Sequence, residues 1–263
     1  MSEVGTGDTG FHFTQPKSAS DSRHRRDIVE ILVAYALIIA ALWTPRPLQF
    51  AIDLTALAWV IWATICSFES LTIMGLRGQG FLRSLWVAGV ALLLATLAVA
   101  VSAHLHALHA PYGLLPFVRR FGLYAVWSLL QEFLLLDFFL LRLVRLLESK
   151  TAAVVVTAAL FTGAHAPNPV LMPLVLVWAI VSCVVFLRNQ NLYALGLAHA
   201  ILGICVAVTV PSIADHNMRV GLGYLIYHPR PAHQRKSNPH TVSTVACVSA
   251  EAPILRSLRQ ARP

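Results

Sequence analysis

Charged residues and cysteines are both scarce in this 263-residue chain. Only 12% of the residues are charged, whereas 57% are hydrophobic, and the mean hydropathy is +0.68. This balance excludes an ordinary soluble globular protein, which carries about twice that share of charge. The composition predicts a polytopic membrane protein with one membrane domain.

The four cysteines do not form a disulfide framework. Cys66, Cys183 and Cys205 lie within apolar runs, Cys247 lies near the C-terminus, and no Cys-x-x-Cys pair occurs. Secreted domains that depend on disulfides carry more cysteines at regular spacing. We therefore expect the cysteines to be buried structural thiols.

Two motifs of hydrolytic enzymes are absent from the sequence. No His-Glu-x-x-His occurs, which argues against a zinc site carried on one helix. No Gly-x-Ser-x-Gly occurs, which argues against a serine nucleophile on a tight turn. The remaining candidates for catalytic residues are the ionisable side chains that lie within the long apolar segments of the sequence.

Apolar runs predict seven helices, several of them close to the ~20 residues that cross a hydrocarbon core. The runs are at about residues 28–43, 50–68, 84–108, 122–147, 152–166, 170–187 and 191–210. Short connections predict that the last three helices are tight antiparallel neighbours. The predicted fold is an all-α, polytopic transmembrane bundle of about seven to eight helices.

The predicted organisation has four parts. They are a disordered polar tail at 1–27, N-terminal transmembrane helices at 28–121, a core bundle at 122–227 and a disordered basic tail at 228–263. Basic residues in the N-terminal tail and in alternate loops predict a cytoplasmic N-terminus. The basic C-terminal tail conflicts with an odd number of spans, so either residues 218–227 re-enter the membrane or the number of spans differs by one.

The net charge of +8 lies in tails and loops. Nucleic-acid binding requires basic charge on a folded surface, so no nucleic-acid partner is expected. The charge is explained better by membrane topology and by attraction to anionic lipids, so the expected partner is the lipid bilayer.

Glu132 lies about ten residues into its apolar run. At that depth an ionised carboxylate costs several kcal/mol unless it is paired or hydrated, so Glu132 is a candidate functional residue. Asp137 follows five residues later. At 100° per residue an α-helix would turn it about 140° away from Glu132, so we expect Asp137 to be a packing or hinge contact on another face.

Two histidines lie at a similar depth, His165 and His199. Phe161 precedes His165 by one helical turn on the same face. Pro167 should end this helix and leave His165 in its last turn. Because Glu132, His165 and His199 belong to three different helices, their combination predicts a functional site better than any one of them. The other histidine group, His104, His106 and His109, is predicted to be interfacial rather than metal-binding, because no acid or thiol is near it.

Three segments carry a family resemblance: QEFLLLDFFLLRL (131–143), FTGAHAPNP (161–169) and GLAHAILGI (196–204). They resemble the three helix motifs of the CPBP family, the CAAX-protease and bacteriocin-processing (Abi) intramembrane proteases. Those motifs are a Glu-Glu pair followed by an Arg, then Phe-x-x-x-His, then His-x-x-x-Asn. The resemblance is close over residues 122–210.

The family motifs are matched in part. Glu132 matches the second Glu, Phe161 and His165 match the second motif, and His199 matches the His of the third motif. The departures from the motifs are Gln131 for the first Glu, Leu136 for the Arg, and Gly203 for the Asn. In the family the first Glu is thought to activate water and the Asn to help hold the oxyanion.

The segment after the last predicted helix offers a replacement for the missing Asn. If it folds back, Asn217 or His216 would take that place, although a polar cap at the helix end is the simpler prediction.

The resemblance implies an endopeptidase in a bacterial inner membrane that cleaves membrane-tethered peptide or protein substrates. Glu132 would act as general base, with His165 and His199 as acids or oxyanion donors. Alternatively, the three residues would bind a zinc ion. A catalytically impaired membrane scaffold or binding protein is a second hypothesis, because of Gln131, Leu136 and Gly203. A transporter is a weaker third, because no broken helices recur in matching halves.

Overall fold

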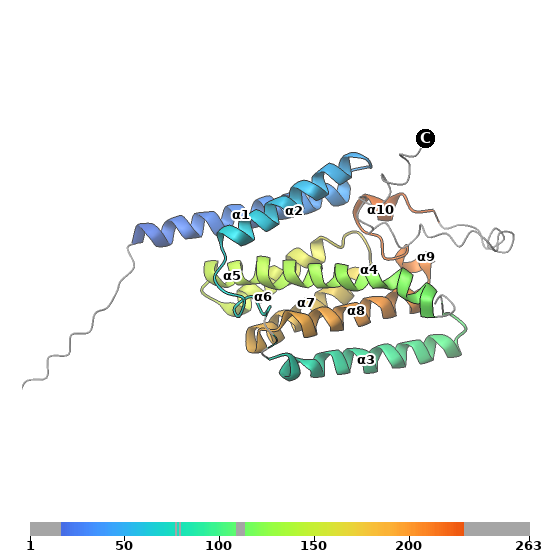
Figure 1. Ribbon diagram of the computed structural model, residues 1–263. Coiled ribbons are helices and arrows are strands. Elements are labelled where there is room, and N and C mark those ends of the chain that lie inside the picture. The colour runs from blue at the N-terminus through green and yellow to red at the C-terminus, as the bar shows by residue number, and fades with distance from the viewer. Residues whose placement is uncertain (1–16, 77, 79, 109–113, 229–263) are drawn as a thin grey trace, which may run out of the picture.

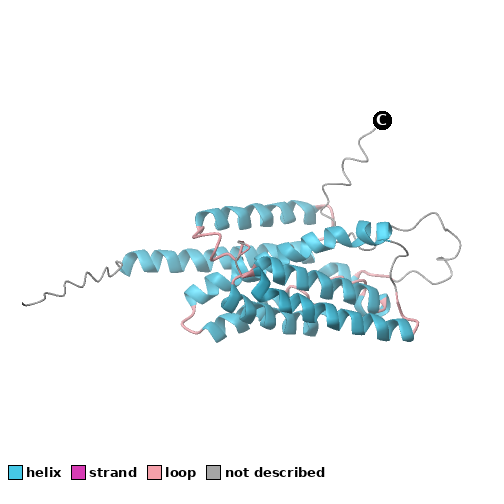
Figure 2. Cartoon of the chain, turned by 60° about the horizontal axis from the view of Figure 1, so that its bottom comes forward, coloured by secondary structure: helices cyan, strands magenta, loops and turns pink. Residues whose placement is uncertain are grey.

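The structure, a computed structural model, describes residues 17–76, 78, 80–108 and 114–228. Within these ranges every regular element is a helix, which confirms the all-α prediction (Figure 2). The elements are α1 (Lys17–Trp43), α2 (Leu48–Cys66), α3 (Phe81–His104), α4 (Leu114–Glu132), the π-helix η1 (Phe133–Leu140), α5 (Leu141–Leu146), α6 (Lys150–Gly163), α7 (Leu171–Asn189), α8 (Leu192–Thr209), α9 (Ser212–Asp215) and α10 (Gly221–Leu225).

Five candidate membrane spans are present in the described part of the chain. They are α2, α3, the continuous helix Leu115–Leu146, α7 and α8. Each has at least 18 residues with few charges, which is close to the length that crosses a bilayer. The helix α6 is apolar but has only 14 residues, and α1 carries charges through its first half.

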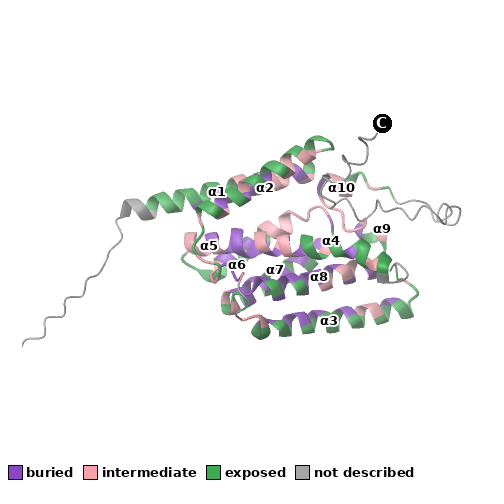
Figure 3. Cartoon of the chain, viewed as in Figure 1, coloured by how far each residue is buried: buried purple, intermediate pink, exposed green. Residues whose placement is uncertain are grey.

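The bundle is arranged around α8, which lies between α3 and α4 (Figure 1). The helices α6 and α7 pack together, as their short connection predicts, whereas α8 packs mainly on α3 and α4 and much less on α7. The hairpin of α1 and α2 covers another side, where α1 touches α5 and α10. Buried residues concentrate in η1, α7 and α8, while α2 and α3 keep long exposed apolar faces (Figure 3).

The first helix is longer than predicted. It begins at Lys17, whereas residues up to 27 were expected to be disordered. The helical extension is stabilised by Asp27 and Glu30, which are buried against α5. Arg145 binds Asp27 through two hydrogen bonds of 2.9 and 3.0 Å, and these pairs offset the cost of burying the carboxylates. Residues 1–16 and 229–263, also predicted to be disordered, lie outside the described residues.

Arg142 connects three helices. Its Nε donates to Glu30 Oε2 at 2.7 Å, and its two terminal nitrogens donate to the carbonyls of Phe138 and Ala63 at 3.0 and 3.2 Å. The guanidinium also lies 4.0 Å above the Phe138 ring. The sequence does not indicate this contact, because the partner Glu30 is 112 residues away.

The segment after α8 folds back over the turn between α6 and α7. The Asn168 side chain donates to the carbonyls of Asp215 and Arg219 at 2.8 and 3.0 Å, and the N–H of Gly221 donates to the Ala166 carbonyl at 2.7 Å. With a φ of 55°, Gly221 presses on the Leu42 carbonyl so closely that no side chain would fit. The helix α10 has five residues, so it is too short to be a further span.

The cysteines only partly follow the prediction. Cys183 and Cys205 are buried, as expected, but Cys66 is exposed. The reason is its position at the end of α2, a helix that packs almost entirely on α1 and leaves its other face open. Cys247 lies outside the described residues.

Candidate active site

A π-helix shapes the site. The helix that starts at Leu114 changes from α to π geometry at Phe133, directly after Glu132. In a π-helix the backbone hydrogen bond joins residues i and i+5, so each turn holds more residues than an α turn. Asp137 therefore lies one π turn after Glu132, on the same side of the helix.

This geometry corrects the expected placement of Asp137. The predicted separation of about 140° assumed α-helical rotation, which does not apply across Phe133–Leu140. Asp137 is 5% exposed, and neither carboxylate oxygen has a hydrogen-bond partner among the described residues. Unpartnered buried polar groups are rare, and π segments occur often at functional sites.

Glu132 is fully buried and accepts three hydrogen bonds. The Trp178 indole donates to Oε1 at 2.5 Å, the Ser182 hydroxyl to Oε2 at 2.6 Å, and His199 Nδ1 to Oε1 at 2.8 Å. The donors come from α7 and α8, so the carboxylate joins three helices. These bonds compensate for the loss of water around a buried charge.

Trp178 and Ser182 are members of the site that sequence reasoning missed. Neither residue belongs to a motif of the sequence. Their spacing of four residues places both on one face of α7, and that spacing is the signal that could have identified them. Both face an acid 46 to 50 residues away in the chain.

His199 is held in a single orientation. Its Nδ1 must carry the proton, because the Glu132 carboxylate can only accept. Its Nε2 forms no hydrogen bond with any described residue. The ring centroid lies 5.8 Å from that of Trp178 and 6.1 Å from that of Phe161, which meets it edge-on.

His165 lies near Glu132 and His199, in the turn that follows α6. Its Nδ1 donates to the Phe161 carbonyl at 2.7 Å, and the two rings are 4.7 Å apart. The helix ends at Gly163, so His165 lies in the turn that follows rather than in the last helical turn. The Phe161 ring thus contacts the rings of both His165 and His199. The structure brings Glu132 and His199 into direct contact, and it brings His165 beside them.

The positions that depart from the family motifs have separate surroundings. Leu136 is fully buried in the apolar core, and Gln131 is partly exposed. Gly203 leaves a space that the Tyr124 hydroxyl fills, so closely that a Cβ at this position would overlap it. Because Gly203 lies one turn after His199, Tyr124 brings a hydroxyl to the side of the bundle where the family motif has an amide.

Asn217 forms no hydrogen bond with Glu132, His165 or His199. Its side chain donates to the Tyr227 hydroxyl at 2.6 Å, and its backbone N–H donates to Asp215 Oδ1 at 2.9 Å. His216 stacks on Tyr224, with the ring centroids 4.1 Å apart. Burial raises the pKa of the Asp215 carboxyl group. The backbone N–H groups that donate hydrogen bonds to this carboxyl group offset part of the rise in its pKa. The segment has the local bonding of a polar cap at the end of α8.

The described residues do not fit a zinc site made of Glu132, His165 and His199. No group of three His, Cys, Asp or Glu side chains in this part of the chain is arranged to hold a metal ion. Glu132 and His199 bond to each other, and His165 Nδ1 is bonded to a carbonyl. No catalytic step is therefore assigned to a metal. Of the other histidine group, His104 and His106 are exposed, and His109 lies outside the described residues.

The comparison with protein families selects the same part of the chain. Residues 113–205 match the family model "Type II CAAX prenyl endopeptidase Rce1-like". This match is consistent with a CPBP family protease and confirms the resemblance seen in the three motifs. It includes Glu132, Trp178, Ser182, His165 and His199. No curated protein and no solved structure matches the chain significantly.

The Rce1-like match covers about a third of the chain and suggests a CAAX-type intramembrane endopeptidase. Together with the apolar helices, it indicates an integral membrane protein whose environment is lipid.

Proposed function

We propose that the protein is an intramembrane endopeptidase of the CAAX-processing type, and that the Glu132–His199 pair activates its water. The hydrogen bond of 2.8 Å between His199 Nδ1 and Glu132 Oε1 carries this proposal. A buried carboxylate that orients an imidazole and leaves the second ring nitrogen unbonded is the arrangement of a general base. The substrate class is a peptide or protein tethered to the membrane.

His199 is the base in this mechanism. With the proton on Nδ1, the neutral ring presents a lone pair at Nε2, which takes a proton from the attacking water. Glu132 holds the ring and stabilises the imidazolium that forms. The Glu132 carboxylate has about four acceptor sites, and its three donors leave one of them. Glu132 therefore mainly positions His199. This mechanism does not require the first Glu of the family motif, which Gln131 replaces here.

His165 supplies the second imidazole. The bond from Nδ1 to the Phe161 carbonyl fixes the ring and leaves Nε2 as its other functional atom. In the proposed reaction the proton that His199 takes from water is passed to the leaving amine, and His165 Nε2 relays it, which returns both imidazoles to their neutral forms.

The proposed location is a bacterial inner membrane with the N-terminus in the cytoplasm. It is supported by the basic residues at the start of α1, including Arg23, Arg25 and Arg26, and by the positive-inside rule. The buried Asp27 and Glu30 on the same helix are neutralised by Arg142 and Arg145, so the exposed charge at that end is positive.

A catalytically impaired scaffold is the second candidate. The donors on Glu132 tie α4, α7 and α8 together, which a structural role alone would also require. Leu136 and Gly203 replace polar motif residues with apolar ones. This alternative predicts that the site variants lose stability but that no cleavage is measured for the unaltered protein.

The test uses purified protein in proteoliposomes with a library of membrane-anchored peptides. His199→Ala and Glu132→Gln are each expected to lower kcat by about 10²- to 10⁴-fold, the range for loss of general acid–base catalysis. His104→Ala is the matched control, because His104 is an exposed histidine at the end of α3. Metal content and the effect of a chelator are measured in parallel. Full turnover by Glu132→Gln, or no cleavage of any peptide by the unaltered protein, would refute the proposed peptidase site.

A further inference from the structure

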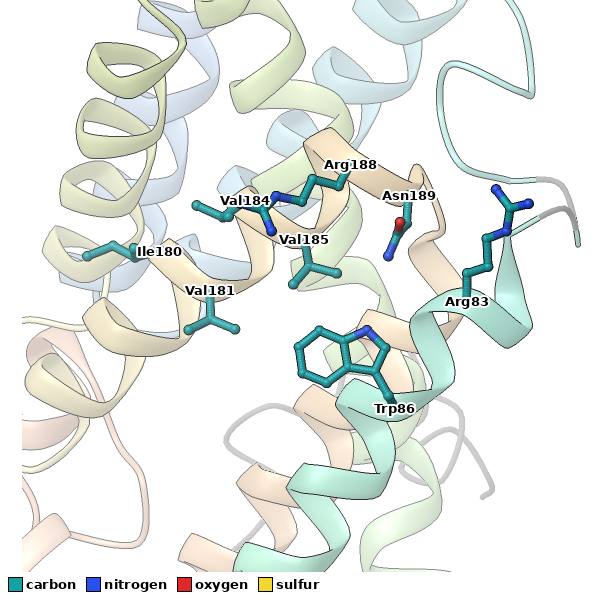
Figure 4. Close-up of a pocket in the computed structure, with 8 residues that line it drawn as sticks. All are labelled: Arg83, Trp86, Ile180, Val181, Val184, Val185, Arg188 and Asn189. Atoms are coloured by element: carbon teal, nitrogen blue, oxygen red, sulfur yellow. The ribbon is translucent and has the colours of Figure 1, made fainter.

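A cavity lies between α3 and α7, and Trp178, Ser182 and His199, which bond to Glu132, do not line it. This cavity of about 530 Å³ separates the start of α3 from the end of α7 (Figure 4). Arg83 and Trp86 of α3 line it, together with Ile180, Val184 and Arg188 of α7. The lining combines two cations with an apolar wall.

Two glycine turns hold the cationic end together. Gly75 and Gly80 have φ values of 65° and 78° and lie against the backbone of the turn between α7 and α8. The N–H of Leu192 donates to the Gly75 carbonyl at 3.1 Å. Because this contact fixes the start of α3 against the end of α7, Arg83 and Arg188 lie at the same end of the bundle.

The two arginines lack counter-charges. The ion pairs in the described residues use Arg23, Arg26, Arg142 and Arg145, and none uses Arg83 or Arg188. Both side chains are exposed. Within the described residues, Arg83 and Arg188 are therefore unpaired on the two walls of the cavity, with their side chains pointing apart and the apolar surface next to Arg188 (Figure 4).

This distribution fits a molecule with an anionic head and an apolar tail. Guanidinium groups bind phosphate oxygens through paired hydrogen bonds. Basic pockets between transmembrane helices bind the head groups of anionic lipids. The exposed apolar residues Ile180 and Val184 lie farther from the helix end than Arg188, in the direction that an acyl chain would run toward the membrane interior.

We propose that this cavity binds an anionic phospholipid, with its head group at the cationic end that Arg83 and Arg188 mark and an acyl chain against Ile180, Val184 and Trp86. The cavity lies at the end of the bundle where α1 begins (Figure 1), and Arg23, Arg25 and Arg26 of α1 are exposed. Trp86 is 56% exposed and has the amphipathic ring that favours the interface. This site is separate from the proposed peptidase function and does not depend on it.

The experiment measures lipid binding by the full chain in detergent micelles. The probes are phosphatidylglycerol and phosphatidylcholine with identical acyl chains, followed by native mass spectrometry and by Tm. Phosphatidylglycerol is expected to remain bound and to raise Tm, whereas phosphatidylcholine does neither. Removing both charges, in Arg83→Gln with Arg188→Gln, should weaken phosphatidylglycerol binding about 10- to 30-fold, since each basic residue contributes about 1 kcal/mol.

The matched control removes two charges elsewhere. Arg119 and Arg120 are exposed residues of α4, and Arg119→Gln with Arg120→Gln should leave lipid retention unchanged. Inorganic phosphate is tested alone, because a site for free anions would bind it without an acyl chain. Equal binding of both lipids, an equal loss in the control variant, or a Tm shift from phosphate alone as large as that from phosphatidylglycerol would each overturn the proposal.

Discussion

The Tyr124 hydroxyl lies against the backbone of Gly203, in the space that a side chain at position 203 would need. The contact joins α4 to α8 one turn away from His199, so it affects both the packing of these helices and the surroundings of the site. The same two helices also approach closely at Gly196, where a Cβ would press on Leu129. Small residues on α8 thus permit its close packing in the bundle.

The first prediction concerns this contact. Gly203→Ala should lower the free energy of unfolding by about 1–3 kcal/mol, because the new methyl group overlaps the tyrosine. The same Gly203→Ala change should cost less stability when Tyr124 is already alanine, because the hydroxyl that the methyl group overlaps is then absent. The cost is measured as the difference between Gly203→Ala with Tyr124→Ala and Tyr124→Ala alone. Denaturant unfolding in detergent measures the effect. Gly89→Ala on α3 is the control, since no atom lies near the added Cβ and the change should be neutral or stabilising. Equal effects at Gly203 and Gly89 would contradict the packing described.

The second prediction concerns the donors that hold Glu132. Ser182→Ala and Trp178→Phe each leave an acceptor of the buried carboxylate unpaired, which should cost about 1–3 kcal/mol of stability. If Glu132 orients His199, both variants should also lower kcat more than they raise KM. Trp62→Phe is the control, because Trp62 is exposed on α2. Unchanged kcat in both donor variants would argue against a positioning role for this carboxylate.

The third prediction tests the buried ion pair between α1 and α5. Arg142→Met leaves Glu30 without its closest cation and should destabilise the protein by about 3–5 kcal/mol. Replacing both partners, in Arg142→Met with Glu30→Leu, should be less harmful than the single change, because no buried charge then remains unpaired. Thermal unfolding of the purified variants separates the two. A double variant less stable than Arg142→Met would show that this reasoning is wrong.

The fourth prediction concerns Asp137, whose carboxylate is buried without a partner among the described residues. Asp137→Asn keeps the shape and removes an acidic group that is buried without such a partner. It should raise the free energy of unfolding on the order of 1 kcal/mol. Denaturant titration compares it with Glu132→Gln, in which an amide donor replaces one of the two acceptor oxygens that Trp178, Ser182 and His199 contact, so that this variant should destabilise. Loss of stability in Asp137→Asn would indicate that the carboxylate has a favourable partner.

By itself, the sequence determined the helices and the candidate residues. All seven predicted apolar runs lie largely within helices, because the hydrocarbon core requires long, uninterrupted apolar segments. The depth of Glu132, His165 and His199 within those runs marked them as costly and hence candidate functional groups. The spacing of Phe161 and His165 brought their rings together as predicted, because residues one turn apart share a helix face.

Tertiary structure decided which of these groups meet and what surrounds them. A hydrophobic period shows which face of a helix is apolar, but not which other helix that face contacts. The bonds from Trp178 and Ser182 to Glu132, the pairing of Arg142 with Glu30 and the filling of Gly203 by Tyr124 all join distant segments. The π-helix likewise moved Asp137 toward Glu132 against the α-helical expectation. These relationships depend on how side chains fill the space between packed helices, a property of the folded bundle rather than of any one segment.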